Sequence, residues 1–173
     1  LRVNLTAGTC TPEPLNREWA ALYLGQRGLA TKYLAEEIDP KVDALSPGNK
    51  LIMATGPLTG TMASTGGRYS VITKSPLTGC IACSNSGGFI GNEIKMAGWD
   101  MIIFEGRSPT PVYLYVENDK AELIDASHLW GKSVWDTDHQ LHTDHQDPLL
   151  RIACVGRAAE QGCLYSGVIN DLH

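Results

Sequence analysis

The spacing of apolar residues changes near residue 49 and divides the chain into two patterns. Leu1 to Leu5 alternate between apolar and polar types, which predicts a short strand before the turn at residues 6–8. Asn16 is a suitable N-cap for a helix whose apolar residues follow at helical spacing as far as Gly25. A second helix is predicted from Ala30 to Ile38, and it ends at Asp39-Pro40 because the residue before proline avoids helical backbone.

After residue 49, short runs of β-favouring residues alternate with glycine-rich corners. They predict strands at Lys50–Thr55, Tyr69–Lys74, Met101–Glu105, Pro111–Val116, Ala121–Asp125 and Leu149–Val155. A polar turn over 117–120 predicts a hairpin, and one-sided apolar spacing predicts helices at Ile90–Ala97 and Ser133–His145. Strands outnumber helices and are mostly joined by turns. The sequence therefore predicts an α+β fold of mostly antiparallel β-sheets with short helices.

A repeated glycine-rich turn is the main candidate for chemistry. Pro-Leu-Thr-Gly occurs at 57–60 and 76–79, and a Gly-Gly pair follows each copy, at 66–67 and 87–88. The two segments deliver Arg68 and Asn85. Glycine lets the backbone approach a ligand, turn N–H groups can bind anions, and arginine binds phosphate oxygens with two parallel hydrogen bonds. The segments therefore suit a phosphate-bearing ligand, while the alternative is a β-meander with glycines at its corners.

Composition and charge narrow the class of protein. The 173 residues suffice for one domain with a substantial core. A net charge of −5 without any basic run argues against a general nucleic-acid binder. The longest apolar runs, such as Leu51–Ala54 and Met101–Phe104, are too short to span a bilayer, and no leader opens the chain. We therefore expect a soluble, cytoplasmic protein without membrane association.

The cysteines do not form a disulfide framework. They are Cys10, Cys80, Cys83, Cys154 and Cys163, an odd and scattered set that favours reduced thiols. Cys80 and Cys83 form a C-x-x-C, but no second pair and no nearby histidine completes a zinc or iron–sulfur site. The chain begins without methionine and stops abruptly, so we interpret it as a fragment of a longer protein.

Other motifs give weaker signals. Residues 136–145 contain Asp136, Asp138, His139, His142, Asp144 and His145. Histidines three apart on a helix could share a metal ion, but no further ligands are evident, so a solvated polar face is the favoured interpretation. Rossmann, Walker and nucleophile-elbow motifs are missing from the sequence, which argues against dinucleotide, P-loop and serine-hydrolase chemistry.

Several segments of the sequence resemble one known family. The matching segments, in chain order, are Asn49–Gly60 (NKLIMATGPLTG), Thr65–Tyr69 (TGGRY), Thr73–Gly79 (TKSPLTG), Asn85–Gly88 (NSGG), Lys95–Asp100 (KMAGWD), Asp125–Lys132 (DASHLWGK) and the closing Asn170-Asp171. These segments closely resemble the N-terminal domain of the tungsten-containing aldehyde:ferredoxin oxidoreductases. The likeness covers essentially the whole chain, so residues 1–173 are expected to be the N-terminal, tungstopterin-binding domain of a longer oxidoreductase.

The resemblance implies a base of antiparallel sheets on which a tungsten bis-pyranopterin (tungstopterin) rests. It implies a parent enzyme that oxidises aldehydes with water to carboxylic acids, and a [4Fe–4S] cluster that passes electrons to ferredoxin or an iron–sulfur subunit of an oligomer. By the same resemblance both Pro-Leu-Thr-Gly turns would shape one side of the tungstopterin seat. There Arg68 would bind the pterin phosphate region and Gly87 would lie against the pterin. Asn85 would join a phosphate-bridging Mg²⁺ site through its backbone carbonyl. Two adjacent phosphates repel each other, so they need a cation and guanidinium charge.

Some features depart from the family pattern. Gly156-Arg157-Ala158-Ala159-Glu160 stands where a Gly-Pro-Ala-Gly-Glu-like turn is expected. The cluster cysteines and the catalytic residues of the family fall beyond residue 173, so Cys80 and Cys83 are not assigned to the cluster and this segment alone is expected to be inactive.

A related tungsten subunit, such as an aromatic acyl-CoA reductase, is the alternative within the family. A structural or assembly module without cofactor is the alternative from another class.

Overall fold

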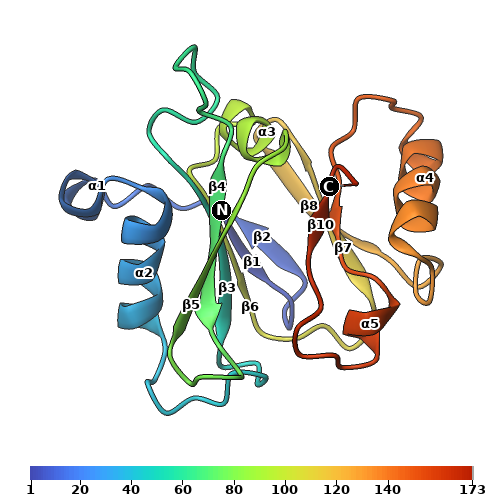
Figure 1. The fold of residues 1–173 in the computed structure, drawn as a ribbon, viewed down its shortest axis with the longest axis horizontal. Coiled ribbons are helices and arrows are strands. Elements are labelled where there is room, and N and C mark those ends of the chain that lie inside the picture. The colour runs from blue at the N-terminus through green and yellow to red at the C-terminus, as the bar shows by residue number, and fades with distance from the viewer. Residues whose placement is uncertain (173) are drawn as a thin grey trace.

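A six-stranded sheet stands between two unlike layers in the computed structural model, which describes residues 1–172 (Figure 1). Its strand order is β2-β1-β6-β3-β4-β5. The bounds are β1 Arg2–Asn4, β2 Thr9–Thr11, β3 Lys50–Thr55, β4 Tyr69–Lys74, β5 Ile81–Ser86 and β6 Met101–Glu105. Neighbouring strands are antiparallel except β1 and β6, which are parallel. The antiparallel α+β prediction is therefore confirmed.

Two helices cover one face of this sheet, seen in blue beside the green strands in Figure 1. They are α1 Arg17–Tyr23 and α2 Gln26–Glu37. Asn16 caps α1 as predicted, because its side-chain oxygen accepts a hydrogen bond from the Trp19 N–H over 3.0 Å. The buried apolar residues between α2 and the sheet are Leu29, Ala30, Leu34, Ile52, Ala54, Ile72, Met101 and Ile103. Every second residue of β3 points into this core, as the two-residue period of a strand requires.

The other face is covered by the second half of the chain (Figure 1). Its elements are α3 Ile90–Met96, β7 Val112–Glu117, β8 Lys120–Asp125, α4 Val134–His145, β9 Ala153–Cys154, α5 Arg157–Glu160 and β10 Ile169–Asn170. β7 and β8 form the predicted hairpin, and β9 and β10 form a second two-stranded sheet. Val3, Tyr69, Ile90 and Ile102 form the buried core of this face, and side chains of the hairpin pack against it. Because both faces are covered, the central strands are apolar on both sides.

The structure corrects three sequence predictions. The second helix begins at Gln26 and not at Ala30; Gly28 is a weak helix former, but its missing side chain lets α2 pack against the Tyr23 carbonyl, which a Cβ would approach to 2.5 Å. Strand β5 was not predicted, because its sequence Ile-Ala-Cys-Ser-Asn-Ser favours strands only weakly. The predicted strand Leu149–Val155 shortens to β9, because its partner β10 offers only two residues for pairing.

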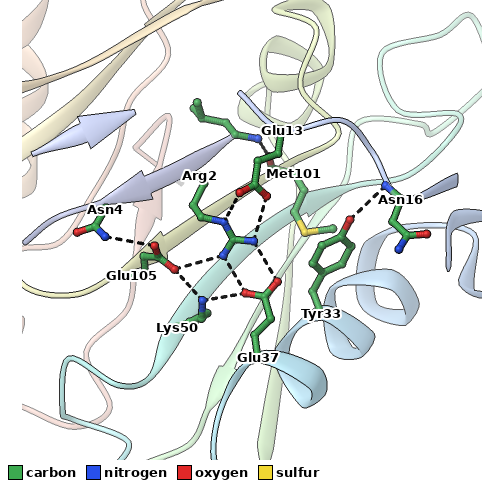
Figure 2. Close-up of polar contacts among 10 residues, drawn as sticks. Arg2, Asn4, Glu13, Asn16, Tyr33, Glu37, Lys50, Met101 and Glu105 are labelled. Carbon is green, nitrogen blue, oxygen red and sulfur yellow. Dashed lines mark hydrogen bonds and ion pairs between the residues drawn. The ribbon is translucent and has the colours of Figure 1, made fainter. Parts of the chain in front are cut away.

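An ion-pair network ties α2 to the sheet, at the opposite end of β3 from residues 56–68 (Figure 2). Arg2 Nε lies 2.8 Å from Glu13, and Arg2 Nη1 lies 2.8 Å from Glu37 and 3.2 Å from Glu105. Lys50 Nζ lies 2.8 Å from Glu37 and 2.7 Å from Glu105. Burial raises the pKa of Glu37, but hydrogen bonds from Arg2 and Lys50 outweigh it and hold the pKa below its usual range. The same balance lowers the pKa of Glu105, with Lys50 as its main partner.

Candidate cofactor-binding site

The two Pro-Leu-Thr-Gly turns lie at opposite ends of β4. The first belongs to the loop of residues 56–68 between β3 and β4, and the second belongs to the loop of residues 75–80 between β4 and β5. Gly60 and Gly79 close the two turns with positive φ angles of 73° and 69°. Because an antiparallel chain reverses at each corner, successive corners alternate between the two ends of the sheet. The expectation that both turns shape one side of one site is therefore wrong.

The second glycine pair, and not the second turn, returns to the first turn. In the register of β4 and β5, Ser70 faces Asn85, which places the end of β5 beside Arg68. The Arg68 Nη1 group donates a hydrogen bond to the Asn85 side-chain oxygen over 2.7 Å. Both side chains are exposed, and Gly87 follows two residues later. The structure thus brings together the three residues that the sequence singled out.

The backbone of Arg68 is held from two sides. Its carbonyl accepts hydrogen bonds from the Gln26 side-chain amide over 2.8 Å and from the Thr59 hydroxyl over 3.2 Å. Thr59 is only 3% exposed, and its oxygen also accepts from the Gly56 N–H over 2.9 Å. The corresponding Thr78 of the second turn is exposed. The carbonyl of Arg68 is therefore fixed while its guanidinium stays at the surface.

Sequence reasoning missed these supporting residues. The Thr59 hydroxyl could have been noted from the turn motif itself, whereas the approach of Gln26 depends on how α2 meets the loop. Asn92 of α3 adds a third support, since its side-chain oxygen accepts from the Gly60 N–H over 3.1 Å. Gly91 lets α3 press against the first glycine pair, because a Cβ there would lie 2.7 Å from the Gly67 carbonyl oxygen.

Gly87 differs from its neighbour Gly88 in what the fold requires. Gly88 has a φ of 78°, a conformation that favours glycine. Gly87 does not have a positive φ, and a Cβ built on it would meet no atom within 4 Å among residues 1–172. The fold of the described chain therefore does not itself require glycine at position 87. The open space beside it leaves the backbone accessible to a group outside the described chain.

The charge at this place suits an anion. Within residues 1–172 no carboxylate lies within ion-pair distance of Arg68, and its one side-chain hydrogen bond goes to a neutral amide. A guanidinium carries five N–H donors, so most of them stay available to phosphate oxygens. The Asn85 side chain is oriented at both of its ends, because its oxygen accepts from Arg68 and its nitrogen donates to the Ser70 hydroxyl over 3.3 Å. These features fit a phosphate-bearing cofactor.

The histidines of helix α4 contact neighbouring protein groups. The His142 Nδ1 atom lies 2.7 Å from the Asp147 carbonyl oxygen, and its Nε2 atom lies 3.7 Å from the Asp138 carboxylate. The His145 Nε2 atom lies 3.0 Å from the Tyr113 hydroxyl of β7. In the described part of the chain, no three His, Cys, Asp or Glu side chains are grouped as a metal site. Residues 1–172 also contain no helix with the length and apolar character needed to cross a bilayer.

Comparison with known proteins identifies the family. The pattern of the family described as "Aldehyde ferredoxin oxidoreductase, N-terminal domain" matches residues 1–173. The chain belongs to this family. It is 54% identical over 173 residues to the tungsten-containing aldehyde ferredoxin oxidoreductase of Pyrococcus abyssi and 52% identical to that of Pyrococcus horikoshii. Each match includes 100% of this chain but only 28% of the relative's length.

Two further relatives of this aldehyde ferredoxin oxidoreductase domain carry different names. The WOR-like subunit of an aliphatic sulfonate oxidoreductase from Pyrococcus furiosus is 37% identical over 134 residues, which are 76% of this chain and 21% of that protein. A chain of the active-site complex BamBC of benzoyl coenzyme A reductase, solved with 1,5-dienoyl-CoA, matches with a TM-score of 0.95 and 40% identity. That match covers 98% of this chain and 26% of the solved one. The domain fold is thus shared by enzymes with different substrates.

Proposed function

We propose that residues 1–173 form the cofactor-cradling domain of a longer tungstopterin aldehyde oxidoreductase. One observation supports this most directly. The exposed guanidinium of Arg68 is joined to Asn85 by a 2.7 Å hydrogen bond, next to a glycine that the fold leaves open. A cationic group beside accessible backbone is what a cofactor with phosphate groups needs. The family membership of the chain gives this surface its most direct interpretation.

Three residues divide the binding work in this proposal. Arg68 donates to the pterin phosphate oxygens, and Asn85 both orients Arg68 and offers its backbone carbonyl to a phosphate-bridging Mg²⁺. Gly87 lets the pterin lie against the backbone, because no Cβ intervenes. When bound, tungstopterin supplies the redox centre at which an aldehyde and water become a carboxylic acid. The chain's own residues contribute binding and orientation only, so we expect this segment alone to be inactive.

The full reaction is a two-electron oxidation. An aldehyde and one water give a carboxylic acid, two protons and two electrons. In this proposal the electrons leave through a [4Fe–4S] cluster held by residues outside this chain and reach ferredoxin or an iron–sulfur subunit of an oligomer. We retain the cytoplasmic location as part of the proposal, because the odd and scattered cysteines suit a reducing compartment.

The substrate class rests on the comparison of relatives. The aldehyde ferredoxin oxidoreductases of four organisms are 49–54% identical to this chain, whereas the benzoyl coenzyme A reductase chain is 40% identical. Reduction of an aromatic acyl-CoA is nevertheless the second candidate, because the TM-score of 0.95 shows that the same domain fold occurs in such an enzyme. A structural or assembly module without cofactor is the remaining alternative.

The full-length protein tests these alternatives. The purified enzyme is analysed for tungsten and assayed for aldehyde-dependent reduction of a viologen dye and, separately, for turnover of benzoyl-CoA. Tungsten together with aldehyde oxidation supports the proposal. Tungsten with benzoyl-CoA turnover and without aldehyde oxidation supports the second candidate, and a protein with neither tungsten nor molybdenum supports the module without cofactor.

A further inference from the structure

Two consecutive residues at the end of β10 contact the second glycine pair from a different sheet. The Asn170 side-chain amide donates to the Ser86 hydroxyl over 2.8 Å. The Asp171 carboxylate accepts from the Phe89 backbone N–H over 2.9 Å. Ser86 immediately precedes Gly87-Gly88 and Phe89 immediately follows it. The pair therefore holds this glycine segment at both of its ends.

The same two side chains limit the space over Gly88. A Cβ on Gly88 would lie 2.9 Å from the Asn170 side-chain oxygen and 2.9 Å from the Asp171 carboxylate. Real Cβ atoms do not approach other atoms so closely, and the positive φ of Gly88 also favours glycine. Asn170 and Asp171 thus lie against the Gly88 backbone on one side, while Gly87 remains open.

The pair is itself firmly placed. Asn170 is 4% exposed and pairs with Ala153 across the β9–β10 ladder, and the Asp171 N–H donates to the Ile152 carbonyl over 2.9 Å. The Asn170 side-chain oxygen is buried without a hydrogen-bond partner among residues 1–172. A buried unpaired acceptor is destabilising and calls for an explanation. Here the same amide group holds Ser86 through its nitrogen and faces Gly88 with its oxygen.

We infer that Asn170 and Asp171 are positioning residues for the cofactor cradle, which is the surface formed by Arg68, Asn85 and Gly87. They fix the Gly87-Gly88 segment against the β9–β10 sheet, so that the open backbone at Gly87 lies at a defined place beside Arg68 and Asn85. This inference rests on the proposed function, because it assigns the segment to cofactor binding. Residues that orient a binding group without touching the ligand commonly change affinity by 10- to 100-fold when they are removed, and we expect an effect of about tenfold here.

The test uses full-length enzyme carrying Asp171→Ala, with Asp171→Asn as the conservative variant. Tungsten per chain and its rate of release during dialysis are measured, together with deuterium uptake by the peptide that contains Phe89. For Asp171→Ala we expect about tenfold faster tungsten release and faster exchange at Phe89. Asp171→Asn keeps an acceptor oxygen and is expected to restore both values to near those of the wild type.

Glu160→Ala is the matched control, because both oxygens of that carboxylate accept from the Gly131 backbone N–H over 3.0 Å, outside the cradle. Ser86→Ala is the milder variant if Asp171→Ala does not fold, and it removes only the hydroxyl that Asn170 contacts. Tungsten release no faster in Asp171→Ala and Ser86→Ala than in Glu160→Ala overturns the inference. If Arg68→Ala loses tungsten and the Asp171→Ala and Ser86→Ala variants do not, the proposed function stands and the positioning role of Asn170 and Asp171 is overturned. A wild-type enzyme without tungsten overturns both the proposed function and the positioning role.

Discussion

The Arg68 guanidinium and the Asn85 side-chain oxygen lie 2.7 Å apart, although the two residues are 17 positions apart in the chain. The contact follows from the pairing of β4 with β5, in which Ser70 faces Asn85. Because Asn85 lies within β5 and Arg68 immediately precedes β4, their relative position is set by the sheet and not by a flexible loop. Such placement lowers the entropic cost of binding a ligand beside them.

Replacement of Arg68 by alanine in the full-length enzyme should impair cofactor loading. The lost charge-assisted hydrogen bonds correspond to about a 10- to 100-fold lower affinity for the phosphate-bearing group. Tungsten per chain should fall, and activity per bound tungsten should stay near that of the wild type. Arg107→Ala is the control, because Arg107 is an exposed arginine beyond the end of β6. Normal tungsten content together with normal activity in Arg68→Ala would contradict the proposed role.

Gly87 and Gly91 should differ in their response to substitution by alanine. Gly87→Ala should leave the unfolding free energy of the 173-residue chain within about 0.5 kcal/mol of the wild type, because its Cβ meets no atom. Gly91→Ala should cost about 1–3 kcal/mol, because its Cβ would lie 2.7 Å from the Gly67 oxygen. Urea denaturation followed by tryptophan fluorescence measures both. Equal effects of the two variants would refute the packing assigned to α3.

The ion-pair network should make stability fall in acid. The pKa values of Glu37 and Glu105 are lowered on folding from an ordinary value of 4.5, so their contribution is fully present above that pH. It should be lost as the pH falls through their lower folded-state values. Denaturation of the 173-residue chain between pH 7 and pH 3 measures this, and the decline should begin near pH 4.5.

Glu37→Gln should lower the unfolding free energy by about 2 kcal/mol at pH 7, between the values typical of exposed and buried ion pairs. The difference from the wild type should shrink in acid. Its neighbour Glu36 is the matched control, since Glu36 is 49% exposed and within residues 1–172 pairs with Lys32 alone, whereas Glu37 is 23% exposed. Glu36→Gln should cost about 0.3–0.5 kcal/mol. Equal losses for both variants would show that the network adds nothing to an exposed pair.

Adjacent residues of β3 should differ sharply in their contribution to stability. Ile52 is completely buried against α2, whereas Leu51 is 37% exposed on the other face. Ile52→Ala should cost about 2–5 kcal/mol, because it removes buried surface and leaves a cavity. Leu51→Ala should cost distinctly less. Thermal or urea denaturation of the two variants compares them directly, and a similar cost for both would contradict the orientation of β3.

In the proposed enzyme, the C-x-x-C pair should be dispensable for the [4Fe–4S] cluster. Cys83 lies within β5 and Cys80 just before it, and both side chains are exposed without a third ligand nearby in the described chain. Replacing both by serine in the full-length enzyme should leave iron per chain unchanged. Loss of about four iron atoms, the content of one such cluster, would instead place these cysteines among its ligands.

The sequence predicts the elements whose own residues define them. Lys50–Thr55, Tyr69–Lys74 and Met101–Glu105 have the predicted bounds, because each is a β-favouring run limited by glycine, proline or polar residues. Strand β5 escapes prediction because its stability comes from pairing with β4 and not from its own residues. The parallel pairing of β1 with β6 leaves no local signal at all.

The candidate site divides in the same way. The glycine-rich motifs and the family resemblance are enough to name Arg68, Asn85 and Gly87 as candidates. Their proximity, however, depends on the register of β4 with β5. Without that register, the two similar turns look like halves of one site. Gln26, Asn92 and Asp171 reach the site from other elements, so only the assembled fold reveals them.

The parallel pairing of β1 with β6 has a consequence for how the chain acquires its structure. Arg2 and Glu105 contact each other although 103 positions separate them, whereas β3, β4 and β5 pair through adjacent hairpins. Contacts so distant in sequence form slowly, because a long loop must close first. During synthesis β1 leaves the ribosome long before β6 exists. We therefore expect the hairpins to form first and docking of the N-terminal strand to be the late, rate-limiting step of folding.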